Sequence, residues 1–227
     1  MANVKIFEFF GLPGSGKTSV ARTFEYEGSF SVEEFRRFRT IRSVRNLLSF
    51  FLFCLIYCKY ILFGLFYLVD DYDFITPKVF FMRIKRFFVL MKSLHTLSLV
   101  ESSCKSPYIF IEEGPLQMAW SISFPDYTSG IRMFSLVNRF YHEQNLDIKI
   151  INVVSDVEAV VPRILKRRGK GRFDNLNEDV LRKTLTQARK FNASLKINSL
   201  FAGLEILEIE NNNIQESSSI IRERFLL

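Results

Sequence analysis

The residues best suited to chemistry in this 227-residue sequence stand close to its start. Gly11, Gly14 and Gly16 fall within six positions, and Lys17 and Thr18 follow at once. Glycine permits positive φ angles and lets the backbone approach another group closely, so that successive N–H groups can point into one concavity. A helix that begins directly afterwards adds its positive dipole end. The arrangement suits an anion.

The spacing Gly11-x-x-x-x-Gly16-Lys17-Thr18 matches the Walker A pattern, in which a loop cradles phosphates. In this interpretation the Lys17 ammonium reaches the β- and γ-phosphates of a nucleoside triphosphate such as ATP, and the Thr18 hydroxyl ligates Mg²⁺. A chance glycine turn before a helix is the alternative. The residues predicted to bind the cofactor are Gly11, Pro13, Gly14, Ser15, Gly16, Lys17, Thr18 and Ser19.

The segments on either side of the loop favour the phosphate site. Residues 4–10 mix β-branched and aromatic side chains, as a short buried strand does. After the loop, Val20, Ala21 and Phe24 have helical spacing and can share one face. A strand before the loop and a helix after it are the context that the pattern requires.

Two acids end another predicted strand. The stretch "YIFIEEG" begins as a buried strand and continues with Glu112 and Glu113. In open α/β sheets ligands sit beyond the carboxyl ends of the strands, so we expect both acids beside the phosphates. Glu112 is then a catalytic acid and, with Thr18, a ligand of Mg²⁺. Glu113 or Glu33 is a candidate base for an acceptor hydroxyl. A solvated acid pair that opens a turn is the alternative.

A third group of residues is cationic. In "PRILKRRGKGRFD", Arg163 and Arg167 stand four apart on a predicted helix and face the same way, and Arg172 follows in a loop interrupted by glycines. Arginines on such a segment can stabilise the charge that develops on a transferring phosphoryl group while they exclude water. A solvated basic face and an RNA-contacting patch are the alternatives.

The composition, 48% hydrophobic and 24% charged, is that of a globular protein, and the length suits one domain. A net charge of +7 favours anionic partners. Cys54, Cys58 and Cys104 indicate packed thiols, because neither a disulfide framework nor metal-ligand spacing is present. The first twenty residues hold the glycine loop where a signal pattern would stand, so we expect a cytoplasmic location.

Strand and helix patterns alternate outside the middle of the chain, which predicts an α/β fold. We expect three layers, with a doubly wound, mainly parallel sheet of five strands between helices. Residues 28–32 fit either the second strand or, through Ser31 and Glu34, a helical capping box. The expected strands are 4–10, 28–32, 108–111, 147–156 and 204–210. The expected helices are 17–25, 33–48, 158–168, 178–197 and 215–227.

Two long, Phe-rich helices are predicted at residues 47–69 and 77–100. The first is long and apolar enough to cross a bilayer, but Lys59 near its middle opposes that. The basic and aromatic composition fits a peripheral contact with the inner face of a membrane through residues 43–92. Packing within the core, or against a second copy in a homodimer, is the alternative.

The order "GLPGSGKTS", "YIFIEEG" and "PRILKRRGKGRFD", followed by a strand and a helix, resembles the small P-loop kinases, most closely the thymidylate kinase and deoxynucleoside kinase branch. The resemblance covers about residues 3–35 and 105–227. It implies a single kinase-like domain at 1–227, with a helical insertion at about 40–100 and an arginine-rich lid at about 162–176.

Carried over to this chain, Lys17 and Thr18 match the phosphate lysine and the magnesium hydroxyl of that branch, and Glu112 matches its strand-end acid. Arg163, Arg167 and Arg172 match its lid arginines. Two features depart from the pattern: Glu113 stands where the branch usually has arginine, and Glu33 and Glu34 only loosely echo the acid after its second strand.

The sequence therefore predicts an ATP-dependent kinase that transfers the γ-phosphoryl group of Mg-ATP to a small nucleoside, nucleotide or sugar-like acceptor. A P-loop switch or NTPase that acts with a protein or membrane partner is the alternative. Nucleic acid is not an expected partner, because the aromatic residues lie in apolar blocks and do not alternate with basic ones.

Overall fold

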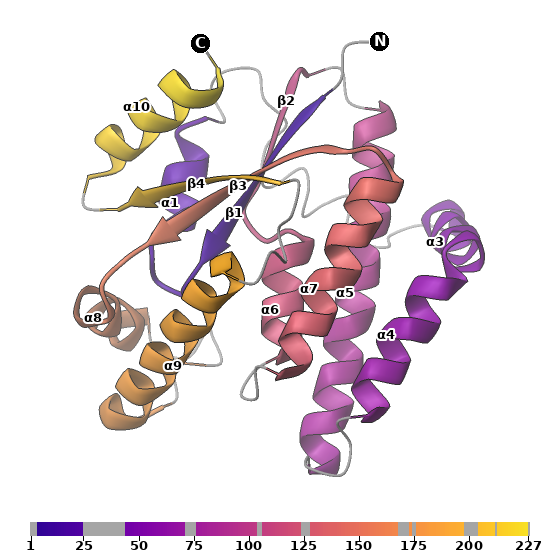
Figure 1. Cartoon of the computed structure of the whole chain (residues 1–227), viewed down its shortest axis with the longest axis horizontal. Helices are drawn as coiled ribbons and strands as arrows, with labels where there is room; N and C mark the ends of the chain where they lie inside the picture. Colours follow the sequence, from indigo (N-terminus) through magenta and orange to yellow (C-terminus); the bar gives the residue numbers. More distant parts are fainter. Residues whose placement is uncertain are drawn as a thin grey trace.

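The computed structural model describes residues 4–24, 44–70, 76–103, 106–123, 128–167, 173, 176–197, 204–211 and 213–226. In this part of the chain one parallel sheet forms the centre of the molecule, with the strand order β2-β1-β3-β4 (Figure 1). The strands are β1 (Lys5–Gly11), β2 (Tyr108–Ile111), β3 (Asp147–Val154) and β4 (Glu205–Glu210). The α/β prediction is confirmed, and the sheet has four strands among the described residues, where five were expected. The predicted strand at 28–32, with its capping-box alternative, lies outside the described residues.

The register of the strands places the chemical residues at one edge of the sheet. Gly11, the last residue of β1, pairs with Val153 of β3, and Glu8 of β1 pairs with Ile111 of β2. Because all four strands run the same way, the segments after β1, β2 and β3 leave the sheet at the same edge. The glycine loop and Glu112 therefore meet there, as ligand-binding segments do in open α/β sheets.

One face of the sheet is covered by α1 (Lys17–Arg22) and α10 (Ile214–Phe225). Successive β1 side chains point to opposite faces, and on this face Phe7 stacks on Phe110 of β2 with ring centroids 4.9 Å apart. Phe24 stacks on the same Phe110 ring at 4.6 Å. Ile221 and Phe225 of α10 join this apolar cluster, so that the helix after the loop is fixed to the sheet by aromatic packing.

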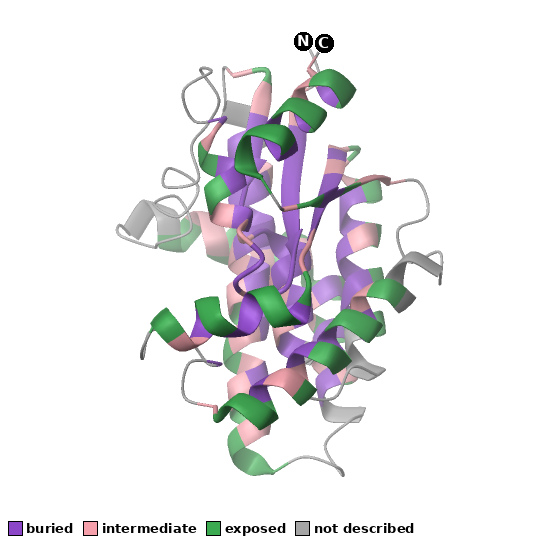
Figure 2. Cartoon of the chain, turned by 90° about the vertical axis from the view of Figure 1, so that its left-hand side faces the viewer, coloured by how far each residue is buried: buried purple, intermediate pink, exposed green. Residues whose placement is uncertain are grey.

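The other face carries α5 (Pro77–Ser103), α6 (Pro115–Ser123), α7 (Thr128–Glu143), α8 (Val157–Arg167) and α9 (Glu178–Ile197). Helices α5, α6 and α7 run side by side in Figure 1, and the buried residues concentrate on the sheet and on the inner helix faces in Figure 2. No element was predicted for residues 115–146. Their signal is the apolar series Met133, Phe134, Val137, Phe140 and Tyr141, which has helical spacing and is buried.

The prediction of one continuous helix at 47–69 is wrong. The segment forms two helices, α3 (Val44–Ile56) and α4 (Cys58–Asp70). The two helices meet at Tyr57 with a bend of 80°. The Tyr57 hydroxyl donates a hydrogen bond to Gln144 Oε1 at 2.7 Å, and Lys59 pairs with Glu143. The charge in the middle of the apolar run is therefore matched by an acid at the end of α7.

Helix α4 packs closely on α5. A Cβ atom at Gly64 would lie 2.1 Å from Cε2 of Phe87, so only glycine allows this approach of the two helices. Tyr60 and Leu68 of α4 are buried in the same cluster. The second predicted Phe-rich helix is confirmed as α5, which is a single helix of 27 residues.

Candidate phosphate-binding site

The loop between β1 and α1 has the backbone that the glycine spacing predicts. Gly11, Gly14 and Gly16 have φ angles of 144°, 81° and 92°, which side chains rarely permit. A Cβ atom at Gly11 would lie 2.4 Å from the carbonyl oxygen of Val153. Both the φ angle and this close approach of β3 require glycine at position 11.

The loop is held from the two neighbouring strand ends. Nδ2 of Asn211, which follows β4, donates to the Ser15 carbonyl oxygen at 2.7 Å, and Oγ of Ser155, which follows β3, donates to the same oxygen at 3.2 Å. Since a trans peptide points its N–H away from its C=O, these bonds turn the Gly16 N–H in the opposite direction. A Cβ atom at Gly16 would lie 1.9 Å from Asn211 Nδ2.

Sequence reasoning missed Asn211 and Ser155. Their available signal is position: Asn211 stands directly after a predicted strand and Ser155 at the end of another, at the edge of the sheet where the loop lies.

A cavity of about 200 Å³ opens between the loop, the end of β2 and the end of α8. Its lining includes residues from three segments that are far apart in the sequence. These residues are Pro13, Gly14, Gly16, Lys17, Thr18, Ser19, Glu112, Glu113, Gln117 and Arg167. The cavity is therefore bordered by hydroxyls, amide groups, two acids and two cations.

Lys17 lies against its own loop at the floor of this cavity. Its Nζ donates to the carbonyl oxygens of Gly11 at 2.9 Å and Leu12 at 2.8 Å, and only 9% of the residue is exposed. Burial lowers the pKa of Lys17 to about 8, an effect that Glu112 and Glu113 oppose and Arg167 reinforces. The ammonium form is still the major one at neutral pH, so the cavity has a fixed positive charge at its base.

Thr18 and Glu112 are in direct contact. The Thr18 hydroxyl donates a hydrogen bond to Glu112 Oε1, although the two residues belong to α1 and to the end of β2. Glu112 is 6% exposed, whereas Glu113 is half-buried on the cavity wall. A hydroxyl and a carboxylate oxygen side by side are the oxygen donors that Mg²⁺ prefers.

No group of three or more His, Cys, Asp or Glu residues that could hold a metal ion occurs in the described ranges. A magnesium ion here would therefore depend on Thr18, Glu112 and the oxygens of a ligand, as in sites where most ligands are phosphates and water.

Helix α8 brings arginines to the loop. Arg163 Nη1 donates to the Gly14 carbonyl oxygen at 3.3 Å, and Arg167, one turn later, lines the cavity. A Cβ atom at Gly14 would lie 3.2 Å from side-chain atoms of both Val160 and Ile164, which shows how closely α8 packs on the loop. Arg172 lies outside the described residues, as do Arg168 and Lys170, so the predicted lid is described only in its first part.

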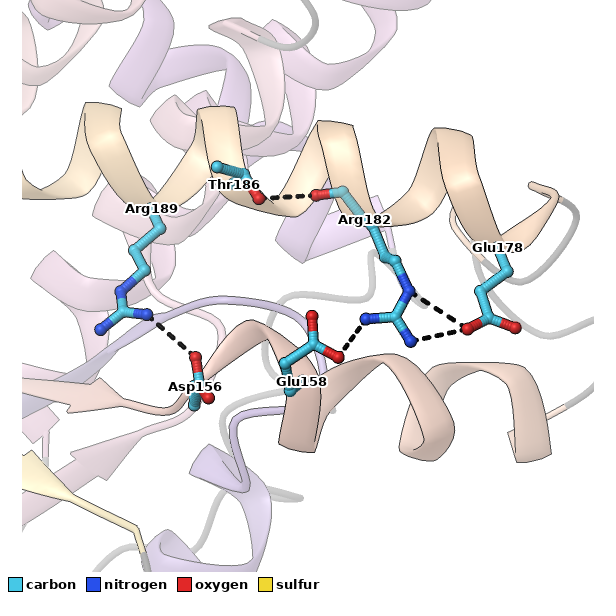
Figure 3. A network of polar contacts seen from close by, with 6 residues as sticks. All are labelled: Asp156, Glu158, Glu178, Arg182, Thr186 and Arg189. Carbon is cyan, nitrogen blue, oxygen red and sulfur yellow. Dashed lines mark hydrogen bonds and ion pairs between the residues drawn. The ribbon is translucent and has the colours of Figure 1, made fainter.

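A polar network ties α8 to α9 (Figure 3). Nε and Nη2 of Arg182 bond Glu178 Oε1 at 3.1 and 2.6 Å, and Nη1 of the same side chain pairs with Glu158 of α8. Arg189 Nη1 pairs with Asp156 Oδ1 at 3.1 Å, just before α8 begins. Exposed ion pairs contribute little singly; two of these join α8 and the residue before it to α9.

Glu8 is a buried acid that sequence reasoning missed. It projects from β1 toward α6, where Oε1 accepts the N–H groups of Leu116 at 2.7 Å and Gln117 at 3.4 Å. Its Oε2 accepts the Tyr141 hydroxyl at 2.5 Å. Burial raises the pKa of Glu8 to about 7, and these hydrogen bonds limit the rise. Glu8 thus holds the start of α6 and, through it, places Gln117 at the cavity.

Known proteins resemble this chain in structure but not detectably in sequence. No protein-family model matches the sequence, and no curated protein matches it. Solved structures do match: deoxyadenosine kinase from M. mycoides with bound dATP aligns with a TM-score of 0.53 and 14% identity over 98% of this chain and 100% of that one. The same kinase with bound dCTP gives a TM-score of 0.51 and 13% identity, over 97% and 98%.

The chain has a P-loop deoxynucleoside kinase-like fold. The resemblance seen in the sequence is thereby confirmed for the fold. A thymidylate kinase from Candida albicans also aligns over 100% of this chain and 92% of its own, with 10% identity, but its TM-score of 0.48 is too low to support the fold.

Within this kinase-like fold most predicted site residues meet at the cavity. Gly11 and Ser15 belong to the loop but do not line the cavity, and Arg163 reaches it only through the Gly14 carbonyl. Arg172 and the alternative acids Glu33 and Glu34 lie outside the described residues. Gln117 lines the cavity and was not predicted.

Proposed function

We propose that this protein is an ATP-dependent small-molecule kinase, which transfers the γ-phosphoryl group of Mg-ATP to a hydroxyl or phosphate of a nucleoside, nucleotide or sugar-like acceptor. One observation carries the proposal: Lys17, Thr18, Glu112 and Arg167 converge from three distant segments on one cavity beside a loop of positive-φ glycines. The kinases of similar fold, whose structures hold dATP and dCTP, support it.

The residues present fit a magnesium–triphosphate complex. The glycines give the loop its positive-φ backbone and let it pack closely on β3 and Asn211, since a Cβ atom at Gly11 or Gly16 would collide with the Val153 carbonyl or Asn211. The buried Lys17 ammonium and the N–H groups at the start of α1 are suited to phosphate oxygens. Thr18 and Glu112 supply the oxygen donors for the metal ion. When bound, Mg²⁺ neutralises charge on the phosphates and orients them for in-line attack.

The protein's own groups have distinct roles in this proposal. Lys17 and the loop amides hold the phosphates in place, and Thr18 and Glu112 position the metal. Arg167 stabilises charge that develops during transfer. Arg163 acts as a positioning residue, because its contact in the structure is with the Gly14 carbonyl.

Glu113 is the proposed base for the acceptor hydroxyl. It lines the cavity beside Glu112 and is half-buried, so a hydroxyl held against it could transfer its proton as attack begins. Gln117, on the first turn of α6, is the neighbouring group best placed to orient an acceptor, since its backbone N–H is held by Glu8.

A panel of acceptors tests the proposal. Purified protein is incubated with Mg-ATP and with nucleosides, nucleotides or sugars, and products are separated by mass. We expect phosphorylation of at least one acceptor class by the wild type, and a loss of about 10³-fold or more in Lys17→Met. Lys166→Ala, an exposed cation of α8 that does not line the cavity, is the matched control and should leave turnover unchanged.

Two results would contradict the kinase assignment. Equal phosphoryl transfer by wild type and Lys17→Met would show that the loop takes no part in the reaction. Release of free phosphate at a rate that no acceptor changes would assign the chain to the nucleotide-dependent switches or NTPases.

A further inference from the structure

The outer faces of α3 and α4 are apolar and exposed. Among the described residues, eleven of the fifteen exposed large apolar side chains lie on α3, α4 and α5. Nine of them, on α3 and α4, are between 48% and 70% exposed. At roughly 100 Å² for each half-exposed side chain they present about 900 Å², more than the few hundred Å² usual for a monomer. The nine are Leu47, Leu48, Phe51, Leu52, Leu55, Ile56, Leu62, Phe63 and Phe66.

The bend between α3 and α4 keeps this surface on the outside of the molecule. Tyr57 and Lys59 are anchored to Gln144 and Glu143 at the end of α7, and Tyr60 packs edge-to-face on Phe140 at 5.5 Å. In the described ranges no single helix combines the length and apolarity needed to cross a bilayer; only the bent pair Leu47–Ile56 and Cys58–Leu68 does so together. The geometry favours a pair that lies along a surface.

Helix α5 adds a stripe in which basic and aromatic residues alternate. Lys78, Phe81, Lys85 and Phe88 follow one another at spacings of three and four, so they share one face. All four are exposed, with Phe81 at 68% and Phe88 at 47%. Half-buried Lys92 continues the stripe. Phenylalanines flanked by lysines suit an interface in which rings enter an apolar layer while ammonium groups stay among anionic groups.

We propose that the outer faces of α3 and α4, with the α5 stripe, dock on the surface of an anionic phospholipid bilayer. The positive charge of this surface favours anionic lipid as its partner. From residue 44 to residue 100 the sequence has seven Lys and Arg against three Asp, and all three Asp fall at 70–73, at the end of α4 and directly after it. Arg83 is buried and Lys59 pairs with Glu143, so Lys78 and Lys85, with half-buried Lys92, carry the charge of the docking face. Anionic lipid contributes about 1 kcal/mol for each nearby Lys or Arg, and the apolar rings supply burial in the acyl boundary.

An open apolar groove continues this surface. It lies between α3 and the second half of α5 and is lined by Leu48, Leu52, Ile56 and Leu99, among others. A flexible acyl chain fits such a groove, because it can follow an irregular apolar surface. A second copy of the chain fits less well: a two-fold contact pairs this face with itself, and the α5 stripe supplies lysines but no acid to match them.

Flotation with vesicles tests the proposal. The full chain is mixed with vesicles of phosphatidylcholine alone, or of equal parts phosphatidylcholine and phosphatidylglycerol, and the floating fraction is measured. We expect flotation with the anionic vesicles, weakened by salt, and a loss of at least roughly tenfold in affinity for the quadruple variant Phe51→Gln, Leu55→Gln, Phe63→Gln and Phe66→Gln. The double variant Lys78→Gln and Lys85→Gln should lower affinity for anionic vesicles only.

A matched control uses exposed apolar residues on other helices. The double variant Val180→Gln and Ile220→Gln, on α9 and α10, should float like the wild type. Tryptophan emission gives a direct readout, because the only native tryptophan, Trp120, is buried. Emission of Phe63→Trp should shift to the blue on adding anionic vesicles, and emission of Ile220→Trp should not.

Three outcomes would overturn the docking proposal: no flotation of the wild type, equal flotation of the wild type and the quadruple variant, or a vesicle-indifferent dimer that the quadruple variant splits. The last outcome would show that the outer faces of α3 and α4 form a dimer interface with a second copy of the chain. Kinase turnover in detergent-free solution is measured beside each assay, so that failure of membrane docking is distinguished from failure of the proposed function.

Discussion

The hydroxyl of Thr18 donates a hydrogen bond to the carboxylate of Glu112, across 94 positions of sequence. Thr18 stands in the first turn of α1, and Glu112 follows the last residue of β2. The parallel pairing of β1 with β2 is what brings the two together, because both strands end at the same edge. This pair is the proposed magnesium-binding site, and substitution of either residue should affect magnesium binding.

Substitutions at the pair should change the magnesium requirement. Thr18→Ala and Glu112→Gln each remove an oxygen ligand or its charge, so we expect turnover at saturating magnesium to fall about 10-fold to 10³-fold. The concentration of Mg²⁺ at half-maximal rate should rise as well. Thr18→Ser keeps the hydroxyl and should retain most of the activity. A magnesium titration of turnover decides: unchanged half-saturation in both damaging variants would place the metal elsewhere.

Arg167 should matter more than its neighbours on α8. Because its side chain lines the cavity, Arg167→Ala should lower kcat about 10²-fold while the affinity for the nucleotide changes much less. The exposed Lys166 next to it does not line the cavity, so Lys166→Ala should have wild-type kinetics. Steady-state kinetics of the two variants are measured side by side. An equal fall in kcat in both would contradict the proposed role of Arg167.

Gly11→Ala should destabilise the fold as well as abolish activity. The new Cβ atom would meet the Val153 carbonyl at 2.4 Å, in a backbone conformation with φ at 144°. We expect a loss of about 2 kcal/mol or more in the free energy of unfolding. Ser19→Ala, an exposed position on the same segment, should stay within about 0.5 kcal/mol of the wild type. Equal denaturation midpoints for all three proteins would refute the structure of the loop.

Glu8 should make stability depend on pH. Its pKa is about 7 in the folded protein against 4.5 ordinarily, so between these values the folded state holds the additional proton. Relative to Glu8→Gln, the wild type should therefore lose stability as pH rises from 4.5 to 7, by an amount on the order of 3 kcal/mol. Urea denaturation of both proteins across this range measures the difference. A difference that stays flat with pH would mean that Glu8 has the same pKa in the folded and unfolded states.

The local part of the site could be predicted from the sequence. The Walker A spacing specifies a backbone, and the residues that follow a strand are placed by the strand itself, which is why Lys17, Thr18 and Glu112 were found. Arg167 was found because two arginines four apart on a helix share a face. These inferences need only local geometry and the rule that parallel strands end at one edge.

The missed residues depend on tertiary contacts that no local pattern contains. Asn211 supports the loop only because β4 lies beside β3, and Glu8 is visible as a helix-holding acid only once α6 is packed under β1. Tyr57, at the break between α3 and α4, likewise bonds Gln144, 87 positions away. A continuous apolar run shows no sign of such a contact, and it was predicted as one helix for that reason.

Calorimetric titration of the full chain with Mg-ATP tests the central claim most directly. We expect saturable binding to the wild type and none to Lys17→Met. That variant should stay folded, because burial lowers the pKa of Lys17 to about 8 and the buried ammonium therefore costs stability at neutral pH. Binding of equal strength in a folded Lys17→Met protein, or no heat for any nucleoside triphosphate with the wild type, would contradict a phosphate-binding role for the loop.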